Sequence, residues 1–406
     1  MSNEGSIRNQ RAEFVRESQK GVFPTDPTFE AFSDNITSVD WSPTPGVSER
    51  RGIGSPDVAT FHNGPEEHEL TVEYDLQRWV IDGNGDPNDA TGDGVLRNAN
   101  NDLPNTHGVV IREENLDVPA SETVNGATSK DTRLYLVGIG GRVSSVTYSG
   151  DPGSDQPVTV EVTYTFEKIR EYQLDQPGTD DTLDITNNGS SVVDVTVEDE
   201  GAVTAEALSI PAGSTYTTTA SFDNLDAVEL SGDIDGDVVV AESTSGDDLV
   251  RIRGSNHYGH GEGDEGVPAL GSGSHAGAVG TAYETILDDT IERPSGTGLG
   301  YEINSVEFTV ENELDTREQI GTPRMAISAG NRTVEVSTTL VGPTESVQQA
   351  NEALGEVGAN LVWSLSGGSL QADNARLTDF SGVSKSEGEA AMSLDNTFTG
   401  ETVTVN

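Results

Sequence analysis

Two segments of the sequence carry donor groups at spacings that can hold a metal ion. The first is the acidic segment Asp82–Gly94, DGNGDPNDATGDG, whose side-chain oxygens suit Ca²⁺. Its oxygen donors are Asp82, Asn84, Asp86, Asn88 and Asp93. An EF-hand loop requires Gly at its sixth position and a bidentate acid at its twelfth, where this segment has Pro87 and Asp93. The mismatch favours a solvated acidic hairpin loop, and we assign no metal ligand to it.

The second segment is Gly-rich and contains His257 and His260, followed by Glu262 and Asp264. Imidazole and carboxylate groups at this spacing can ligate zinc or a similar ion. The surrounding glycines provide no rigid element to fix a coordination geometry, which favours an exposed loop. The chain has no cysteine, so disulfides, thiolate zinc sites and thiol nucleophiles are excluded.

The sequence also contains no recognisable catalytic or nucleotide-binding motif. It has no Gly-x-Ser-x-Gly elbow with plausible partners, and its Gly clusters lack the strand-to-helix setting and the lysine of a phosphate loop. We therefore predict a protein that is not an enzyme and has no cofactor. We also expect no membrane span and no secretory leader, because no run of eighteen apolar residues occurs and the first thirty residues lack an apolar core.

The 406 residues include 22 Lys and Arg against 70 Asp and Glu, a net charge of −48. This balance disfavours a nucleic-acid-binding or anionic-membrane protein, which needs cations to neutralise phosphates. The acids are spread along the whole chain, so they do not form an acidic tail. A compact chain of this charge repels itself unless salt screens it, and the Debye length falls to about 3 Å in molar salt. The composition predicts a protein of a high-salt environment.

The elements that must position any site are mostly strands. Apolar and polar residues alternate in Leu70–Val80, Val158–Glu167, Tyr301–Val310 and Val334–Val341, which is typical of half-buried strands. An apolar stripe at helical spacing predicts one helix over Thr344–Gly358, and a weaker helix is expected near Ser6–Ser18. The fold class is therefore predicted to be all-β with little helix.

An internal repeat relates the two ends of the chain. Ile36–Ala59 overlays Ile303–Ala326 at an offset of 267, with eight identities in 24 positions. The repeated motif comprises Arg50, Ile53, Gly54 and Pro56 in the first copy and Arg317, Ile320, Gly321 and Pro323 in the second. We interpret Ile-Gly-Ser/Thr-Pro as a tight turn beside the core. For the two arginines, pairing with acids at subunit contacts and a snorkelling surface position stay open.

Three further overlays follow in the same order along the chain, which predicts a duplicated domain. They are His68 over Arg332, Leu134 over Leu361, and the pair Tyr148 and Thr165 over Phe380 and Thr397 at offset 232. Between the copies, Leu183–Ser243 has short alternating strands with Asn-Gly, Pro-Ala-Gly and Asp-Gly turns. That pattern is typical of a small immunoglobulin-type sandwich.

The duplicated part resembles the tail tube proteins of tailed viruses. The N-terminal stretch has an aromatic-x-x-Glu segment running into a Gly-x-x-Pro turn, at Phe14, Glu17, Gly21 and Pro24. The second feature is the repeated strand, basic residue and Ile-Gly-Ser/Thr-Pro turn described above. The resemblance implies a major tail tube subunit, a structural virion protein assembled in the host cytoplasm, whose stacked rings form the conduit for genome ejection. With the acidic composition, it implies a virus of a halophilic archaeon.

The resemblance also sets expectations for architecture and partners. The expected parts are an N-terminal arm (1–35), a first tail-tube β-sandwich or barrel domain (36–172), an inserted Ig-like sandwich (173–250), a Gly-rich linker (251–300) and a second tail-tube domain (301–406). Two copies per chain predict a ring of three chains with pseudo-sixfold symmetry. Expected partners are further copies of the chain and the tape measure, tail terminator and baseplate proteins. Double-stranded DNA would pass through without specific binding, and no membrane is involved.

A different class of protein remains as the alternative. A secreted or surface carbohydrate-binding β-sandwich protein of a halophile, with calcium loops, would also be acidic and rich in strands. Such a protein would be expected to carry a leader segment and clustered aromatic residues that stack on sugars. Aromatic residues make up 5% of this chain and are scattered.

Overall fold

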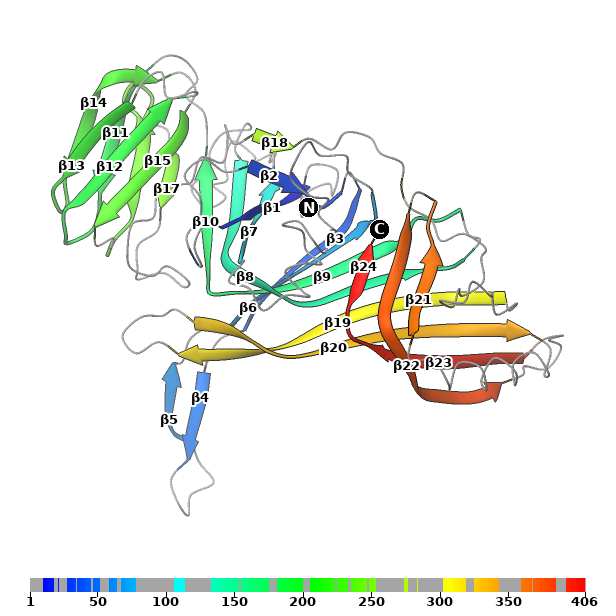
Figure 1. Ribbon diagram of the computed structural model, residues 1–406. Coiled ribbons are helices and arrows are strands. Elements are labelled where there is room, and N and C mark those ends of the chain that lie inside the picture. The colour runs from blue at the N-terminus through cyan, green and yellow to red at the C-terminus, as the bar shows by residue number, and fades with distance from the viewer. Residues whose placement is uncertain are drawn as a thin grey trace, which may run out of the picture.

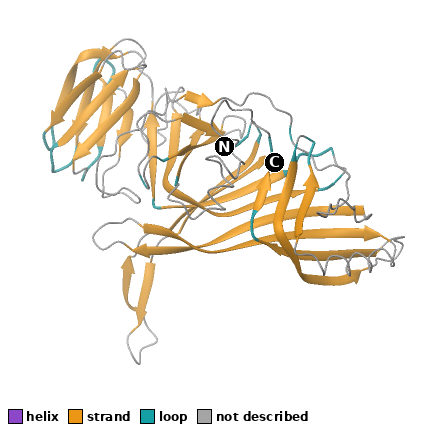
Figure 2. Cartoon of the chain, viewed as in Figure 1, coloured by secondary structure: helices purple, strands orange, loops and turns teal. Residues whose placement is uncertain are grey.

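The computed structural model consists of strands and loops throughout the part of the chain that it describes (Figure 2). The described residues are 10–17, 21, 28–33, 35–44, 47–51, 58–63, 67–77, 106–113, 133–152, 155–174, 181–199, 205–222, 225–232, 235–246, 248–252, 274–276, 283, 302–318, 325–342, 359–366, 368–384 and 392–405. The all-β prediction is confirmed for them. The helix predicted over Thr344–Gly358 lies outside the described residues.

The first repeat unit, β3 to β10, is built from two sheets that share one long strand. Its strands are β3 (Ile36–Thr44), β4 (Val47–Arg51), β5 (Val58–Asn63), β6 (Glu67–Asp75), β7 (His107–Glu113), β8 (Arg133–Gly150), β9 (Thr159–Phe166) and β10 (Lys168–Leu174). One sheet has the order β3-β6-β9-β8 and uses the second half of β8. The first half of β8 lies between β7 and β10 in the other sheet. The β4–β5 hairpin projects from the end of the β3–β6 pair (Figure 1).

The second repeat unit, β19 to β24, has the same strand order. Its strands are β19 (Glu302–Glu318), β20 (Met325–Gly342), β21 (Ala359–Ser364), β22 (Ser369–Ser384), β23 (Met392–Gly400) and β24 (Val403–Val405). The main sheet runs β19-β20-β23-β22, and the first half of β22 lies between β21 and β24. Each strand of the second unit thus has a counterpart with the same neighbours in the first.

Bulge positions make this correspondence exact to the residue. The β3–β6 ladder shifts between Ile36 and Ser38, and the β19–β20 ladder shifts between Ile303 and Ser305, at the offset of 267 read from the sequence. The β8–β9 ladder shifts after Val143 and the β22–β23 ladder after Leu377, an offset of 234. Extra residues in a strand fix the local register, so matching bulges identify equivalent positions.

The remaining sequence overlays differ from this structural register. His68 is equivalent to Val334 and not to Arg332, and Tyr164 is equivalent to Phe398, which corrects the offset of 232 to 234. A slip of two residues keeps every side chain on its face, so alternation alone cannot detect it. The overlay of Leu134 on Leu361 is wrong, because Leu134 lies in β8 whereas Leu361 lies in β21, the counterpart of β7.

The N-terminal segment is a strand, so the helix expected near Ser6–Ser18 is wrong. β1 (Gln10–Arg16) pairs antiparallel with β7 over seven residues and with β2 (Thr28–Ala31). Ala12 and Phe14 are buried in one apolar cluster and Val15 in another, so β1 is covered on both faces. A short strand that is buried on both faces gives no clear period-two signal, and its sequence pattern resembles that of a helix.

The insert is a seven-stranded sandwich beside the first unit (Figure 1). Its strands are β11 (Asp181–Asn187), β12 (Val193–Asp199), β13 (Ala205–Ile210), β14 (Thr215–Phe222), β15 (Leu225–Gly232), β16 (Val238–Glu242) and β17 (Asp248–Ile252). The sheets are β14-β11-β16-β17 and β13-β12-β15. An immunoglobulin sandwich places its third strand with the sixth and seventh. Here the third strand, β13, pairs with β12, so the expected immunoglobulin pairing is not formed.

Two hydrophobic clusters hold these parts together. One runs through the main sheets of both repeat units, from Phe14 and Tyr164 to Phe308 and Phe398. The other joins the insert to the outer face of the β7–β8 sheet. β10 crosses the predicted boundary between 172 and 173, and its Leu174 pairs with Val250 of the insert. β18 (Ser274–Ala276), within the predicted linker, pairs with β2.

Candidate functional site

The two repeat units are joined edge to edge into one eight-stranded sheet. The second half of β8 pairs antiparallel with β19, from Ser145 opposite Glu311 to Gly150 opposite Val306. The resulting order is β3-β6-β9-β8-β19-β20-β23-β22, with every neighbouring pair antiparallel. The Thr147 and Thr309 hydroxyls lie 3.1 Å apart across this junction. The edge of the first unit at β8 and the edge of the second unit at β19 therefore pair with each other within one chain.

The junction is buried on the face that contacts the core. Val146 and Tyr148 of β8 and Phe308 and Val310 of β19 are at most 1% exposed. The Phe308 ring meets Trp363 edge to face at 4.8 Å between centroids. Burying aromatic and branched side chains of this size stabilises each by about 1.5–3 kcal/mol, so the junction is a core and not a superficial contact.

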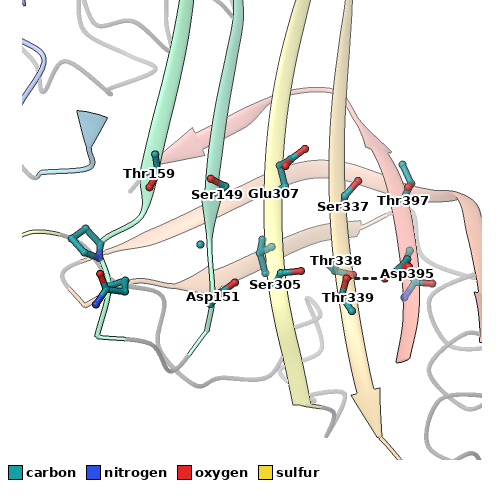
Figure 3. Close-up of a pocket in the computed structure, with 15 residues that line it drawn as sticks. Ser149, Asp151, Thr159, Ser305, Glu307, Ser337, Thr338, Thr339, Asp395 and Thr397 are labelled. Carbon is teal, nitrogen blue, oxygen red and sulfur yellow. Dashed lines mark hydrogen bonds between the residues drawn. The ribbon is translucent and has the colours of Figure 1, made fainter. Parts of the chain in front are cut away.

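The opposite face of the eight-stranded sheet is polar and acidic. Ser149, Glu307, Ser337 and Thr397 form a row across four strands, and the Thr339 hydroxyl donates to Asp395 at 2.7 Å (Figure 3). Carboxylates on this face include Asp40, Glu69, Glu73, Glu161, Glu307, Glu311, Glu335 and Asp395. The described residues of the eight strands contain no lysine, and the register places two arginines, Arg142 and Arg376, on this face. The face thus carries a negative potential along the middle of the sheet.

A shallow depression of about 470 Å³ lies at one end of this sheet. Its lining includes Ser149, Thr159, Ser305, Ser337 and Thr397, which are hydroxyl side chains. The carboxylates of Asp151, Glu307 and Asp395 also line it, and no Lys, Arg or His does, so the depression is acidic and rich in hydrogen-bonding groups. We assign no ligand to it.

Both outer edges of the eight-stranded sheet are open. In the described part of the chain, β3 pairs with β6 alone and the second half of β22 pairs with β23 alone. Val39 and Trp41 of β3 are half-buried, whereas their counterparts Val306 and Phe308 are 2% and 0% exposed. An unpaired strand edge is a template for pairing with another chain.

The first unit fixes the bend of β8 with a carboxylate from the N-terminal segment. Glu17 accepts hydrogen bonds from the backbone N–H groups of Gly140 and Gly21, each at 2.7 Å, and from the Thr106 hydroxyl. Gly140 and Gly21 have φ of 72° and 71°, which glycine adopts without strain. Burial raises the pKa of Glu17 and is the largest influence on it. Each of these hydrogen bonds lowers the pKa by less, and the nearby Glu167 raises it slightly further. The structure thus brings together Glu17 and Gly21 of the N-terminal motif; Pro24 lies outside the described residues.

The second unit makes the same bend with different residues. Asn374, with φ of 49°, stands where the first unit has Gly140. Its backbone N–H donates to the Asn360 side chain at 3.2 Å, and its Nδ2 donates to Glu401 at 2.7 Å. Glu401 is the counterpart of Glu167 at the offset of 234. Sequence reasoning missed this bend, although Arg142 with Arg376 and Glu167 with Glu401 mark the correct offset.

Of the repeated motif, the structure describes the two arginines. Arg50 lies in β4 opposite Thr60, and Arg317 lies in β19 opposite Ala326, so both precede the turn of a hairpin. Arg317 pairs with Asp315 of its own strand at 2.5 Å, with 74% of its side chain exposed. Such a pair contributes about 0–1 kcal/mol. Ile53, Gly54, Pro56, Ile320, Gly321 and Pro323 lie outside the described residues.

The candidate metal segments, Asp82–Gly94 and His257 to Asp264, also lie outside the described residues. Within the described ranges, no three His, Asp or Glu side chains are grouped so as to hold a metal ion. The same ranges contain no helix long and apolar enough to cross a membrane.

Comparison with known proteins gives no family assignment. No protein family model matches the chain, and no curated protein has significant similarity to it.

Proposed function

We propose that this chain is the major tube subunit of a virus tail, and that three chains close into a ring through their sheet edges. The observation that carries the proposal is the eight-stranded sheet, in which two equivalent four-stranded units already pair β8 to β19 and leave equivalent edges open. A chain that repeats one unit twice and pairs it head to tail can continue the same contact to a second copy. Contacts of this kind close into rings.

The strand directions are compatible with closure. Eight antiparallel strands place β3 and β22 in opposite directions, so β22 of one chain meets β3 of the next as β8 meets β19. Three chains contribute 24 strands. At the usual strand spacing and tilt, such a barrel measures about 45–50 Å between opposite backbones. That leaves room for a DNA duplex after side chains are added.

The polar face of the sheet suits the wall of a conduit. The core lies on the other face, so closing the sheet around an axis turns the carboxylates and hydroxyls toward the bore. Carboxylates on this face outnumber its two arginines, Arg142 and Arg376, and it has no lysine, so the wall has few cations that could displace counterions from DNA and hold it. The insert and the β7–β8–β10 sheet lie on the core side and would decorate the outside.

The proposal carries the further expectations of the family resemblance. The subunit would belong to the virion tail of a virus of a halophilic archaeon, be assembled in the host cytoplasm, and contact tape measure, tail terminator and baseplate proteins. Duplication of one tube domain within a gene would explain why strand order and bulge positions repeat.

Electron microscopy of the purified protein in molar salt tests the proposal. We expect stacked rings with threefold rotational symmetry and the mass of three chains per ring. A ring of six chains would overturn the trimer, and monodisperse globules would overturn the tube and favour the carbohydrate-binding alternative.

Salt provides an independent check on the high-salt inference. At −48 per chain, transfer to dilute buffer should loosen the rings, because the repulsion between subunits is no longer screened. Unchanged tubes in dilute buffer would contradict it.

A further inference from the structure

We propose that β22 of one chain pairs with β3 of the next in the register that β8 uses for β19, which places Ser381 opposite Ser42 and Ser384 opposite Asp40. This inference rests on the proposed ring. It specifies the partner surface to the residue, since both edges are counterparts of strands whose pairing is already known.

The register follows from two correspondences. β3 maps onto the first half of β19 at the offset of 267, so Ser42 is the counterpart of Thr309. Ser381 pairs with Asp395 as Thr147 pairs with Glu161, so residue 381 is the counterpart of residue 147. Thr147 lies opposite Thr309 in the junction, with their hydroxyls 3.1 Å apart. Ser381 is therefore placed opposite Ser42.

A second pair of facing residues is derived from the end of β22, beyond Ser381. Ser384 pairs with Ser393 as Ser149 pairs with Thr159, so residue 384 corresponds to residue 149 despite the bulge after Ser381. Ser149 lies opposite Glu307, whose counterpart in β3 is Asp40. Pro43 of β3 has no N–H to donate, so it limits the ladder on this side.

Apolar side chains at the open edges of β3 and β22 are more exposed than their counterparts at the closed β8–β19 junction, which indicates that another strand covers these edges. Val306 and Phe308 of the closed junction are buried, whereas the equivalent Val39 and Trp41 at the open edge are half-buried. On the other side of the seam, Val143 of β8 is 1% exposed, whereas its counterpart Leu377 of β22 is half-buried. Docking β22 against β3 would remove this apolar surface from water, as the pairing of β8 with β19 does at the closed junction.

Engineered disulfides test the register directly, because the natural chain has no cysteine. Two in-register variants are Ser42→Cys with Ser381→Cys and Asp40→Cys with Ser384→Cys. Two matched crossed variants use the same four positions as Ser42→Cys with Ser384→Cys and Asp40→Cys with Ser381→Cys. Within one chain six strands lie between β3 and β22, a distance of about 34 Å across the sheet, so any disulfide must join two chains.

We expect the in-register variants, oxidised in molar salt, to form covalent species of two and three chains at least about tenfold faster than the crossed variants. Thr147→Cys with Thr309→Cys should form a disulfide within one chain and serves as the positive control. Faster crosslinking of the crossed variants would overturn the register. Rings visible by microscopy with no crosslink in any of the four variants would overturn the β22–β3 seam while leaving the tube intact. Absence of rings in the natural chain would instead overturn the proposed function.

Discussion

The two repeat units follow the same backbone path but fill the space beneath their bends differently. In the first unit Gly138 and Gly141 lie under the Phe166 ring, which a Cβ at either glycine would approach to 2.4 Å. In the second unit the equivalent residues are Ala372 and Ala375, and the position of Phe166 is occupied by Gly400. The side-chain volume that β23 lacks at Gly400 is thus partly supplied by the two alanines of β22. Cores tolerate such paired changes because total volume is kept.

The outer faces of the units differ in polarity, and the insert explains why. Val137 and Ile139 of the first unit are 0% and 4% exposed and belong to the cluster shared with the insert. Their counterparts in β22 are Gln371 and Asp373, which are half-buried. The same backbone surface is therefore apolar where a domain docks on it and polar where none does in the described part of the chain. Exchanging equivalent residues between the units tests how far each unit depends on its own surroundings.

The largest effect is expected from Ile139→Asp, which gives the first unit the residue of the second. The change places a carboxylate in an apolar contact with the insert, and an unpaired buried charge costs about 3–5 kcal/mol. Denaturant unfolding in molar salt should show this loss, and hydrogen exchange should rise in the insert and β7. Ile139→Val is the matched control and should cost about 1 kcal/mol. An unperturbed insert in Ile139→Asp would show that the cluster does not hold it.

Gly138→Ala should destabilise the protein by about 3 kcal/mol, because the added Cβ overlaps the buried Phe166 ring. Phe166 contacts Tyr164 and Trp41, which prevents the ring from moving aside. Thermal unfolding measures the loss, and Phe166→Leu in the same chain should recover part of it. The reciprocal control is Ala372→Gly in the second unit, where no ring needs the space. Additive losses for Gly138→Ala and Phe166→Leu would contradict the paired-volume explanation.

The sequence correctly predicts the all-β class and the overlay of β3 on β19, but not the overlay of the later strands of the two units. Both the successes and the failure follow from the two-residue period of a strand. Alternation identifies strands such as Val158–Glu167, and identical residues with a shared bulge fix the register of β3 on β19. The same period of two allows the overlay of Tyr148 on Phe380 to slip by two residues without moving any apolar side chain to the wrong face. β1 is missed because both its faces are buried.

The candidate site depends on pairing between distant strands, which single-sequence patterns do not encode. The β8–β19 junction joins residues about 160 positions apart, as Thr147 and Thr309 show. The bends at Gly140 and Asn374 look unrelated in sequence, because one is capped by Glu17 from another strand and the other by Asn360. Glu17 and Gly21 were accessible only through the family resemblance.

His68 should make the first unit, but not the second, sensitive to mild acid. Burial lowers the pKa of His68 to about 4, against 6.5 for an exposed histidine. As pH falls from 6.5 to 4 the unfolded chain takes up a proton that the folded chain does not, so stability falls by about 3 kcal/mol. His68→Val installs the second unit's Val334 and should remove this component from the pH profile of unfolding. Identical slopes for both proteins between pH 6.5 and 4 would contradict the assignment.

Asn396→Val should stabilise the second unit by about 1–2 kcal/mol. Asn396 and its cross-strand neighbour Thr338 are buried without hydrogen-bond partners for their side chains, at positions where the first unit has Val162 and Val72. Removing an unsatisfied buried amide recovers its desolvation cost. Denaturant midpoints at constant m-value measure the gain. Val162→Asn is the reverse change and should destabilise; a loss of stability in Asn396→Val would indicate that the amide is satisfied in the folded protein.

The smallest effect is expected for Asn374→Gly, which gives the second bend the residue of the first. Glycine relieves the cost of φ at 49° but increases the entropy of the unfolded chain and removes the exposed bond from Nδ2 to Glu401. These effects oppose one another, so the free energy of unfolding should change by less than about 0.5 kcal/mol. Asn374→Ala keeps neither advantage and should cost about 1 kcal/mol. If alanine proved equal to glycine, the positive φ would not be what the two bends share, and the backbone equivalence of Gly140 and Asn374 would lose its physical basis.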